Sequence, residues 1–213
     1  LTNEAGLSWN FAYGGINGTQ LQSVTHSSGR TVTFAWEGIF LKEVRDPAGI
    51  SYQYSYAPVP GVLPSVRAGL AEVRYPDGMQ IGYRYAVNKP WALAKKFYNG
   101  AEYASFTYDS LGNASGSEHA GGLDRYRFSY AAGEGGTTNV IETNPLGKVS
   151  TYAFKGSRLL SVSRTASAAT PAEHKEITYD SNNHRDLVTG FNGNFTDYDY
   201  NEKGQLLRVV EGS

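Results

Sequence analysis

The feature that most constrains the fold is a short phrase that recurs along the whole chain. Each copy consists of an aromatic or apolar residue, one spacer and a second aromatic residue, and the second members lie 20 to 29 residues apart. A repeat of this length indicates an array of small supersecondary units, each of which needs its neighbours to bury its apolar face. The copies are Phe11/Tyr13, Phe34/Trp36, Tyr54/Tyr56, Tyr83/Tyr85, Phe106/Tyr108, Phe128/Tyr130, Tyr152/Phe154, Ile177/Tyr179 and Tyr198/Tyr200.

The segment from residue 31 to residue 50 indicates what one unit folds into. Val32, Phe34 and Trp36 alternate with smaller residues, which is the period of two that a β-strand imposes on side chains. Residues 40–45 form a second apolar run after a Gly turn, and the Asp-Pro-Ala-Gly sequence at 46–49 predicts a tight reversal. We therefore predict that each unit is one β-hairpin, joined to the next hairpin by a second tight turn.

Two turn patterns separate the predicted strands. One ends in Gly and closes successive units; the other follows a Tyr and begins with Asp or Asn, whose side chain can accept backbone N–H groups two residues on. Gly or Asn then tolerates the left-handed conformation that lets the chain reverse. The first pattern occurs at Ser28-Gly29, Ala48-Gly49, Asp77-Gly78, Asn99-Gly100, Gly121-Gly122, Leu146-Gly147 and Asn192-Gly193, and the second at 108–113, 179–184 and 200–205.

The repeat runs from end to end, so we predict a single array of about nine hairpin units over residues 1–213. Irregular insertions are expected near 57–69, 131–138 and 163–173, because these segments are rich in Pro, Gly or small polar residues. The last of them lacks a Gly turn and is expected to be the most flexible. Residues 91–98 resemble a helix most closely but are better interpreted as a strand.

Composition excludes several classes of partner and chemistry. The net charge of −1 and the scattered basic residues give no electrostatic basis for binding nucleic acid. The absence of cysteine excludes disulfides and thiolate chemistry. The sequence also contains no run of 18 apolar residues, which a membrane-spanning helix would require. The chain begins on Leu1 within strand-like sequence, from which we expect a processed piece or fragment of a longer polypeptide.

These repeats resemble the YD-repeat, or Rhs, family. Tyr-Asp occurs at 108–109 and 179–180, the Tyr-Asp-x-x-Gly turn at 108–112, and the Asp-Pro-x-Gly turn at 46–49. The resemblance implies one curved antiparallel sheet of consecutive hairpins that spirals into a hollow β-shell. In bacterial Rhs toxins and in C subunits of insecticidal toxin complexes, such a shell encloses a toxin domain, and related shells occur in teneurins. It also implies a secreted or cell-surface bacterial protein, with type VI secretion as one export route.

Eighteen strands at ~4.8 Å each would extend ~86 Å across the sheet. A wall around a cargo of about 100 residues needs ~25 strands. The chain is therefore expected to form less than one turn of wall, with two sheet edges that a neighbouring segment covers.

Candidate chemistry is sparse and has structural alternatives. Asp109 and Asp180 could be catalytic carboxylates, but their equivalent places in an array predict turn capping and a separation too large for joint action. The four His residues lie in different repeats without metal-ligand spacing. We therefore predict no enzyme activity and no catalytic, cofactor-binding or metal-binding residues.

The aromatic column could stack on sugar rings, although cross-strand packing predicts the same pattern. The sequence thus favours a non-catalytic shell segment that encapsulates a polypeptide toxin, whose partner is that toxin or neighbouring repeats. The alternative is a secreted or surface-attached carbohydrate- or protein-binding module. The residues predicted to define the repeat are Tyr13, Trp36, Tyr56, Tyr85, Tyr108, Asp109, Gly112, Tyr130, Phe154, Tyr179, Asp180, Tyr200 and Gly204.

Overall fold

The computed structural model describes residues 6–61 and 68–213, which form eighteen β-strands and three single-turn 3-10 helices. The strands are β1 (Trp9–Gly14), β2 (Gln20–His26), β3 (Thr31–Glu37), β4 (Phe40–Arg45), β5 (Ser51–Pro58), β6 (Ala68–Arg74), β7 (Gln80–Ala86), β8 (Lys89–Tyr98), β9 (Ala101–Tyr108), β10 (Ala114–His119), β11 (Leu123–Ala132), β12 (Thr138–Thr143), β13 (Val149–Lys155), β14 (Arg158–Arg164), β15 (Glu173–Tyr179), β16 (Arg185–Thr189), β17 (Phe195–Tyr200) and β18 (Leu206–Gly212). The 3-10 helices are η1 (Ile16–Gly18), η2 (Ala120–Gly122) and η3 (Glu134–Gly136).

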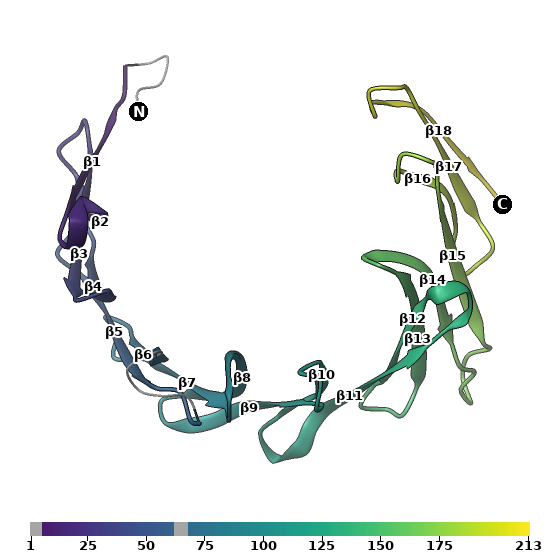
Figure 1. The fold of residues 1–213 in the computed structure, drawn as a ribbon, viewed down its shortest axis with the longest axis horizontal. Helices are drawn as coiled ribbons and strands as arrows, with labels where there is room; N and C mark the ends of the chain where they lie inside the picture. Colours follow the sequence, from purple (N-terminus) through teal and green to yellow (C-terminus); the bar gives the residue numbers. More distant parts are fainter. Residues whose placement is uncertain (1–5, 62–67) are drawn as a thin grey trace. The chain divides into compact units, whose positions relative to one another are not determined.

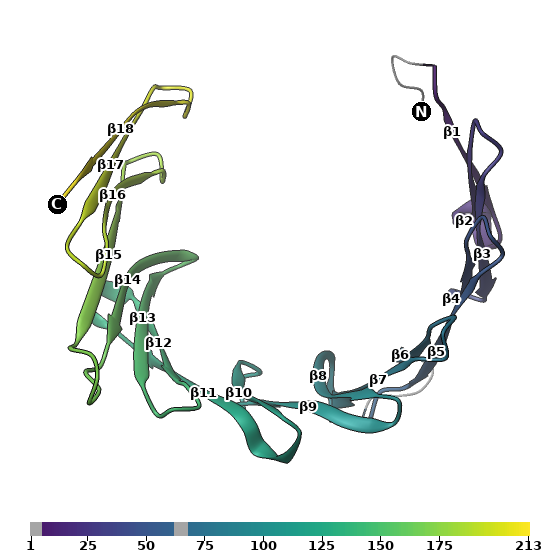
Figure 2. The same ribbon diagram turned by 180° about the vertical axis from the view of Figure 1, so that it is seen from behind.

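The chain divides into two compact units, Leu1–Phe106 and Thr107–Ser213, with the boundary inside β9. Within each unit every strand pairs antiparallel with the strand that follows it in sequence. Both views in Figures 1 and 2 show these strands side by side in chain order within each unit. The predicted all-β fold of tandem antiparallel hairpins is confirmed. The odd-numbered member of each hairpin is called here the first strand and the even-numbered member the return strand.

The two faces of the sheet differ in the way that the alternating sequence predicts. In β3 the large residues Val32, Phe34 and Trp36 are half-buried, while Thr33 and Ala35 between them are exposed. β5 repeats the pattern, with its three Tyr residues half-buried and the intervening residues exposed. One face of each unit therefore carries the rings and the other carries small and polar groups.

Eight turns share one hydrogen-bond pattern, whichever end of the strands they occupy. At 46–50 the amide of Asp46 donates to the carbonyl of Ile50 (2.9 Å), and the amide of Gly49 donates back to the carbonyl of Asp46 (3.0 Å). The fourth residue has positive φ in every copy and is Gly in seven, with Asn183 (φ 70°) in the eighth. The two turn patterns distinguished in the sequence thus have one backbone geometry. These turns begin at His26, Asp46, Tyr75, Asp109, Asn144, Asp180, Gly190 and Asn201.

The other predicted turns and the irregular segments take different forms. Asn99-Gly100 is a two-residue hairpin turn with both φ values positive, and Gly121-Gly122 belongs to η2. The predicted insertions include the ends of strands: residues 57–58 end β5 and 131–132 end β11. Pro64 lies outside the described residues. In the segment predicted to be most flexible, Thr170 Oγ1 accepts a hydrogen bond from Lys148 Nζ (3.2 Å). Residues 91–98 belong to β8, as the sequence predicts.

Little of the chain is withdrawn from solvent. The accessible surface is 13914 Å², whereas a compact monomer of 23.2 kDa would expose about 9,700 Å². Among the described residues only seven apolar residues are buried, and all are Ala, Val or Ile: Val59, Val73, Ile81, Ala92, Ala104, Val162 and Ile177. A single layer of sheet has no second layer to form a core with, so contacts between adjacent strands must supply most of the stability.

The shared turn predicts how Gly49 tolerates substitution. Its φ is +83°, and a Cβ there would meet no atom within 4 Å, so only backbone conformation opposes a side chain. We expect Gly49→Ala to lower the free energy of unfolding by about 1–2 kcal/mol, measured by urea denaturation. Gly49→Asn should cost clearly less, because Asn183 already occupies the equivalent position. Equal losses for Ala and Asn would contradict this interpretation.

Candidate functional site: the junction between successive hairpins

The return strand of most hairpins contains one extra residue opposite the second aromatic residue of the phrase. In the first hairpin Ala12 pairs with Ser23, but Tyr13 pairs with Leu21, so Gln22 is inserted. This is a β-bulge, which locally interrupts the ladder and increases the twist of the strand. The register breaks in the same way at Tyr13, Trp36, Tyr56, Tyr85, Phe154, Tyr179 and Tyr200.

The bulge shortens the pairing between one hairpin and the next. β2 and β3 share only three residue pairs, from Thr25↔Thr31 to Ser23↔Thr33, and the ladder stops at the residue next to the bulge. Three pairs also join β4 to β5, β6 to β7 and β16 to β17. Beyond the last pair, the return-strand carbonyls on that side have lost their ladder partners, and an unpaired carbonyl away from water is costly.

The second aromatic residue of the next hairpin supplies the missing hydrogen bond. Trp36 Nε1 donates to the carbonyl of Leu21 (2.9 Å), the residue just before the bulge in β2. Tyr85 donates to Leu70 (3.1 Å), and Tyr179 to Leu159 (2.9 Å), at the equivalent places. Tyr130 similarly donates to Ala114 (2.8 Å) in the preceding return strand. We call the contact between the second aromatic residue of one hairpin and the return strand of the preceding hairpin the junction.

The Tyr85 ring packs tightly against the backbone of the preceding return strand at its junction. Gly69, next to the accepting Leu70, lies under the ring, and a Cβ at Gly69 would come within 2.5 Å of it. Burial raises the pKa of the Tyr85 hydroxyl, and the neighbouring Tyr83 adds to the shift. The hydroxyl therefore remains protonated, and able to donate, well above neutral pH.

Two junctions use ring contacts of another kind. The Tyr56 ring lies 4.6 Å from that of Phe40, and the Tyr200 ring lies 4.8 Å from that of His184, measured between centroids. Both partners belong to the preceding return strand or to the turn before it. The second aromatic residue thus fills the same gap between hairpins, by packing instead of a hydrogen bond.

The hairpin β11–β12 provides an internal comparison because it has no bulge opposite Tyr130. Pairing there runs without a break from Arg127↔Thr143 to Ala132↔Thr138. The following ladder between β12 and β13 accordingly continues for six pairs and ends at Thr138↔Phe154. Phe154 is the one second aromatic residue without a polar ring atom. Where the ladder continues, no ring donor is needed.

The Asp residues that the sequence singled out close turns. Asp109 Oδ1 accepts the amides of Leu111 (2.9 Å) and Asn113 (2.8 Å), and Asp109 Oδ2 accepts the Asn113 side chain (3.0 Å). The hydrogen bond from the Asn113 side chain, followed by those from the backbone amides, lowers the pKa of Asp109. Asp46, Asn144, Asp180 and Asn201 each accept the same two amides with one Oδ1 atom.

The structure does not bring the candidate catalytic or ligating residues together. The turns of Asp109 and Asp180 are about six strand spacings apart, or on the order of 25–30 Å along the sheet. His184 Nδ1 lies 3.1 Å from Asp180 Oδ2 within its own turn, and His26 and His174 contact neighbouring Ser side chains. No cluster of three or more potential metal ligands occurs among residues 6–61 and 68–213. No helix in the described part of the chain could cross a membrane.

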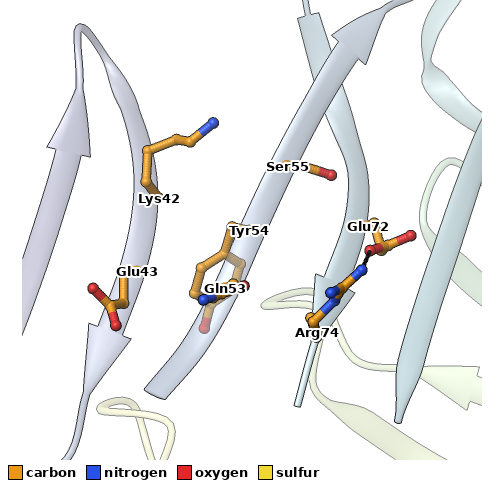
Figure 3. A pocket seen from close by; sticks show the side chains of 7 residues that line it. All are labelled: Lys42, Glu43, Gln53, Tyr54, Ser55, Glu72 and Arg74. Atoms are coloured by element: carbon orange, nitrogen blue, oxygen red, sulfur yellow. Dashed lines mark hydrogen bonds and ion pairs between the residues drawn. The ribbon is translucent and has the colours of Figure 1, made fainter. Parts of the chain in front are cut away.

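A charged hollow of 490 Å³ lies on the polar face of the first unit, lined from β4, β5 and β6 (Figure 3). Its carboxylates are paired along their own strands, Glu43 with Arg45 (2.9 Å) and Glu72 with Arg74 (3.5 Å). A hydrogen bond from Ser51, then Arg45, lowers the pKa of Glu43, which is opposite to what a general acid requires. The lining residues are Lys42, Glu43, Gln53, Tyr54, Ser55, Glu72 and Arg74.

Solved structures that share this fold include toxin complexes. The chain superposes on a Photorhabdus luminescens Tc holotoxin pore carrying a mutated TccC3, with a TM-score of 0.57, 14% identity and 99% of this chain covered. A TcdB2–TccC3 complex without the hypervariable C-terminal region gives the same values. The chain spans 14% of the length of either matched chain. No family model and no curated protein sequence matches it. The fold, an Rhs-like sheet of hairpins, is therefore shared at low sequence identity.

The junction predicts a small, specific loss on removing one hydroxyl. Tyr85→Phe keeps the ring but leaves the Leu70 carbonyl without its donor. We expect the free energy of unfolding to fall by about 0.5–1.5 kcal/mol, measured by urea denaturation. Phe154→Tyr is the matched control, because the uninterrupted ladder beside Phe154 leaves no carbonyl to satisfy, and it should gain nothing. A gain in stability for Phe154→Tyr would contradict the role of the bulge.

The turn at Asp109 predicts a dependence on acid. The carboxyl has a pKa near 3.8 when unfolded and a lower one when folded, so the unfolded chain binds more protons between the two values. Its contribution is complete above pH 3.8 and is lost as pH falls through the folded pKa. Asp109→Asn should retain the turn, as Asn144 and Asn201 do, and should not lose stability as the pH falls through this range. Asp109→Ala should be less stable than wild type at neutral pH as well. Unfolding curves at neutral and strongly acidic pH distinguish the three proteins; identical acid sensitivity of wild type and Asp109→Asn would refute the assignment.

Proposed function

We propose that this chain is a non-catalytic wall segment of an Rhs-type β-shell that encloses a polypeptide toxin. The observation that carries the proposal is the junction, which joins hairpin to hairpin by the same local contacts without any further layer of structure. A sheet built in this way can be extended by adding units, which is what a wall requires. The fold shared with Tc toxin chains supports the same interpretation.

The mechanism of such a wall is exclusion. A continuous sheet separates an enclosed polypeptide from proteases and from other proteins of the producing cell until delivery. Residues with the same role recur once per hairpin, so neighbouring copies are separated by two strand spacings. Such spacing distributes these residues over a surface and does not gather them into one reactive centre. We accordingly assign the chain no catalytic residue.

The proposed partners follow from this role. They are the enclosed toxin polypeptide and neighbouring repeats of a longer chain, as the 14% coverage of the matched chains suggests. The proposed setting is a bacterial protein that is exported as part of a toxin. The absence of the hypervariable C-terminal region from one matched complex is compatible with a variable cargo at that end.

Limited proteolysis of the natural polypeptide that contains this sequence tests the proposal. We expect the enclosed region to resist a protease that rapidly digests the same region expressed alone. Opening the wall by combining Tyr85→Ala and Tyr179→Ala, which removes two junctions of one kind, should make the region accessible. If the region in the intact protein is cut as fast as when it is free, the chain does not enclose it.

A further inference from the structure

The polar face of the first unit carries a row of planar polar side chains that crosses four strands. Glu43 in β4 pairs with Gln53 in β5, and Gln53 pairs with Arg74 in β6, so a carboxylate, an amide and a guanidinium follow one another on adjacent strands. Gln80 in β7 pairs with Arg74 and adds a second amide. We call these four residues the polar row. Its members are one strand spacing apart, so the row extends about 14 Å across the sheet.

Two adjoining hollows lie along the polar row. The charged hollow of 490 Å³ (Figure 3) and a second hollow of 430 Å³ share Gln53 and Arg74 as lining residues. The second hollow is also lined by Ile50, Tyr75 and Pro76, which add apolar surface beside the polar groups. Each volume lies within the range of small-molecule sites, about 300–1,000 Å³. Together the hollows offer a ligand one extended surface that is polar along the row and apolar on one side.

The hollows contain hydrogen-bonding groups that the chain itself does not use. Gln53 and Ser55 are exposed, and in the described part of the chain their side chains make no hydrogen bond. Arg74 has five N–H donors and pairs with Glu72 at 3.5 Å, which leaves most of these donors to solvent. An amide, a hydroxyl and a guanidinium that lie close together can both donate to a ligand and accept from it.

The charges around the first hollow favour an uncharged ligand. Lys42 and Arg74 offset Glu43 and Glu72, and each carboxylate already pairs with an Arg two residues further along its own strand. An anion would meet the carboxylates and a cation would meet the basic groups, and either ligand would lose hydration on entering. The ligand that fits is therefore rich in neutral donors and acceptors. A pyranose ring has this character, because its hydroxyls project from the rim while its C–H faces are apolar.

We propose that the polar row binds an uncharged oligosaccharide that lies across the strands. The planar side chains of the row make paired hydrogen bonds to neighbouring hydroxyls of one ring, and the apolar ring faces pack against Tyr75 and Pro76. The aromatic column is the poorer sugar platform, because the three Tyr rings of β5 are half-buried whereas Gln53 between them is exposed. The site is independent of the shell proposal, since it uses neither the junction nor an enclosed polypeptide.

Isothermal titration calorimetry of the natural polypeptide that contains this sequence tests the site. The probes are cellotetraose, maltotetraose and mannotetraose, with tetragalacturonate as the acidic comparison. We expect at least one uncharged probe to bind, and to bind more tightly than tetragalacturonate. Gln53→Ala should weaken this binding by about 3- to 10-fold, and Arg74→Ala by at least about 10-fold, because hydrogen bonds from a charged group are stronger. Arg84→Ala, on the polar face of β7 but outside both hollows, is the matched control and should leave the affinity unchanged.

A second variant at the same position separates a lost contact from a lost fold. Gln53→Met keeps the length of the side chain but removes its amide donors and acceptor, so it should weaken binding as much as Gln53→Ala does. Urea denaturation checks that the variants unfold as the wild type does, as expected for exposed positions. Three results would overturn the proposal: no binding of any uncharged probe at millimolar concentration, tighter binding of tetragalacturonate, or an affinity that Gln53→Met and Arg74→Ala leave unchanged.

Discussion

The structure depends on what happens to a carbonyl when a β-ladder is interrupted. An extra residue in the return strand ends the pairing with the next hairpin after a few residues. A carbonyl that faces the gap loses its ladder donor, and the second aromatic residue replaces it with a hydroxyl or an indole N–H. Phe154 fits the same rule. The ladder beside it is uninterrupted, so no carbonyl loses its ladder donor there, and the ring has no hydrogen-bond donor.

This arrangement distributes stability along the chain. Few side chains in the described part of the chain are buried, so these residues form no central core that could compensate for a weak unit. Each hairpin relies on its own turn, its own internal ladder and its junction with the hairpin before it, as expected for nearest-neighbour arrays. The ring-to-carbonyl hydrogen bond and the short ladder together therefore connect one hairpin to the next.

Much of this fold could be predicted from the sequence, for identifiable reasons. Alternation of large and small residues fixes the faces, and Asp or Asn followed by Gly specifies the reversal, as at Asp46 and Gly49. The bulges could not be predicted, because the inserted residues share no chemical character; they include Gln22, Lys42, Ala71 and Leu160. A signal for the junction was nevertheless present. The second aromatic residue is Tyr or Trp in eight of nine copies, whereas the first member is Phe or Ile in five of nine.

The same repetition explains why the carboxylates and rings that recur in the sequence do not converge on one point among residues 6–61 and 68–213. A residue that caps a turn or seals a junction is needed once in every hairpin, so its equivalents are spaced along the sheet, as Asp109 and Asp180 are. Convergence of several such groups on one point would require a connection that leaves the array. The described connections instead return each strand directly beside the one before it. The repeated turn and junction contacts of the described residues therefore serve to continue the sheet from one hairpin to the next.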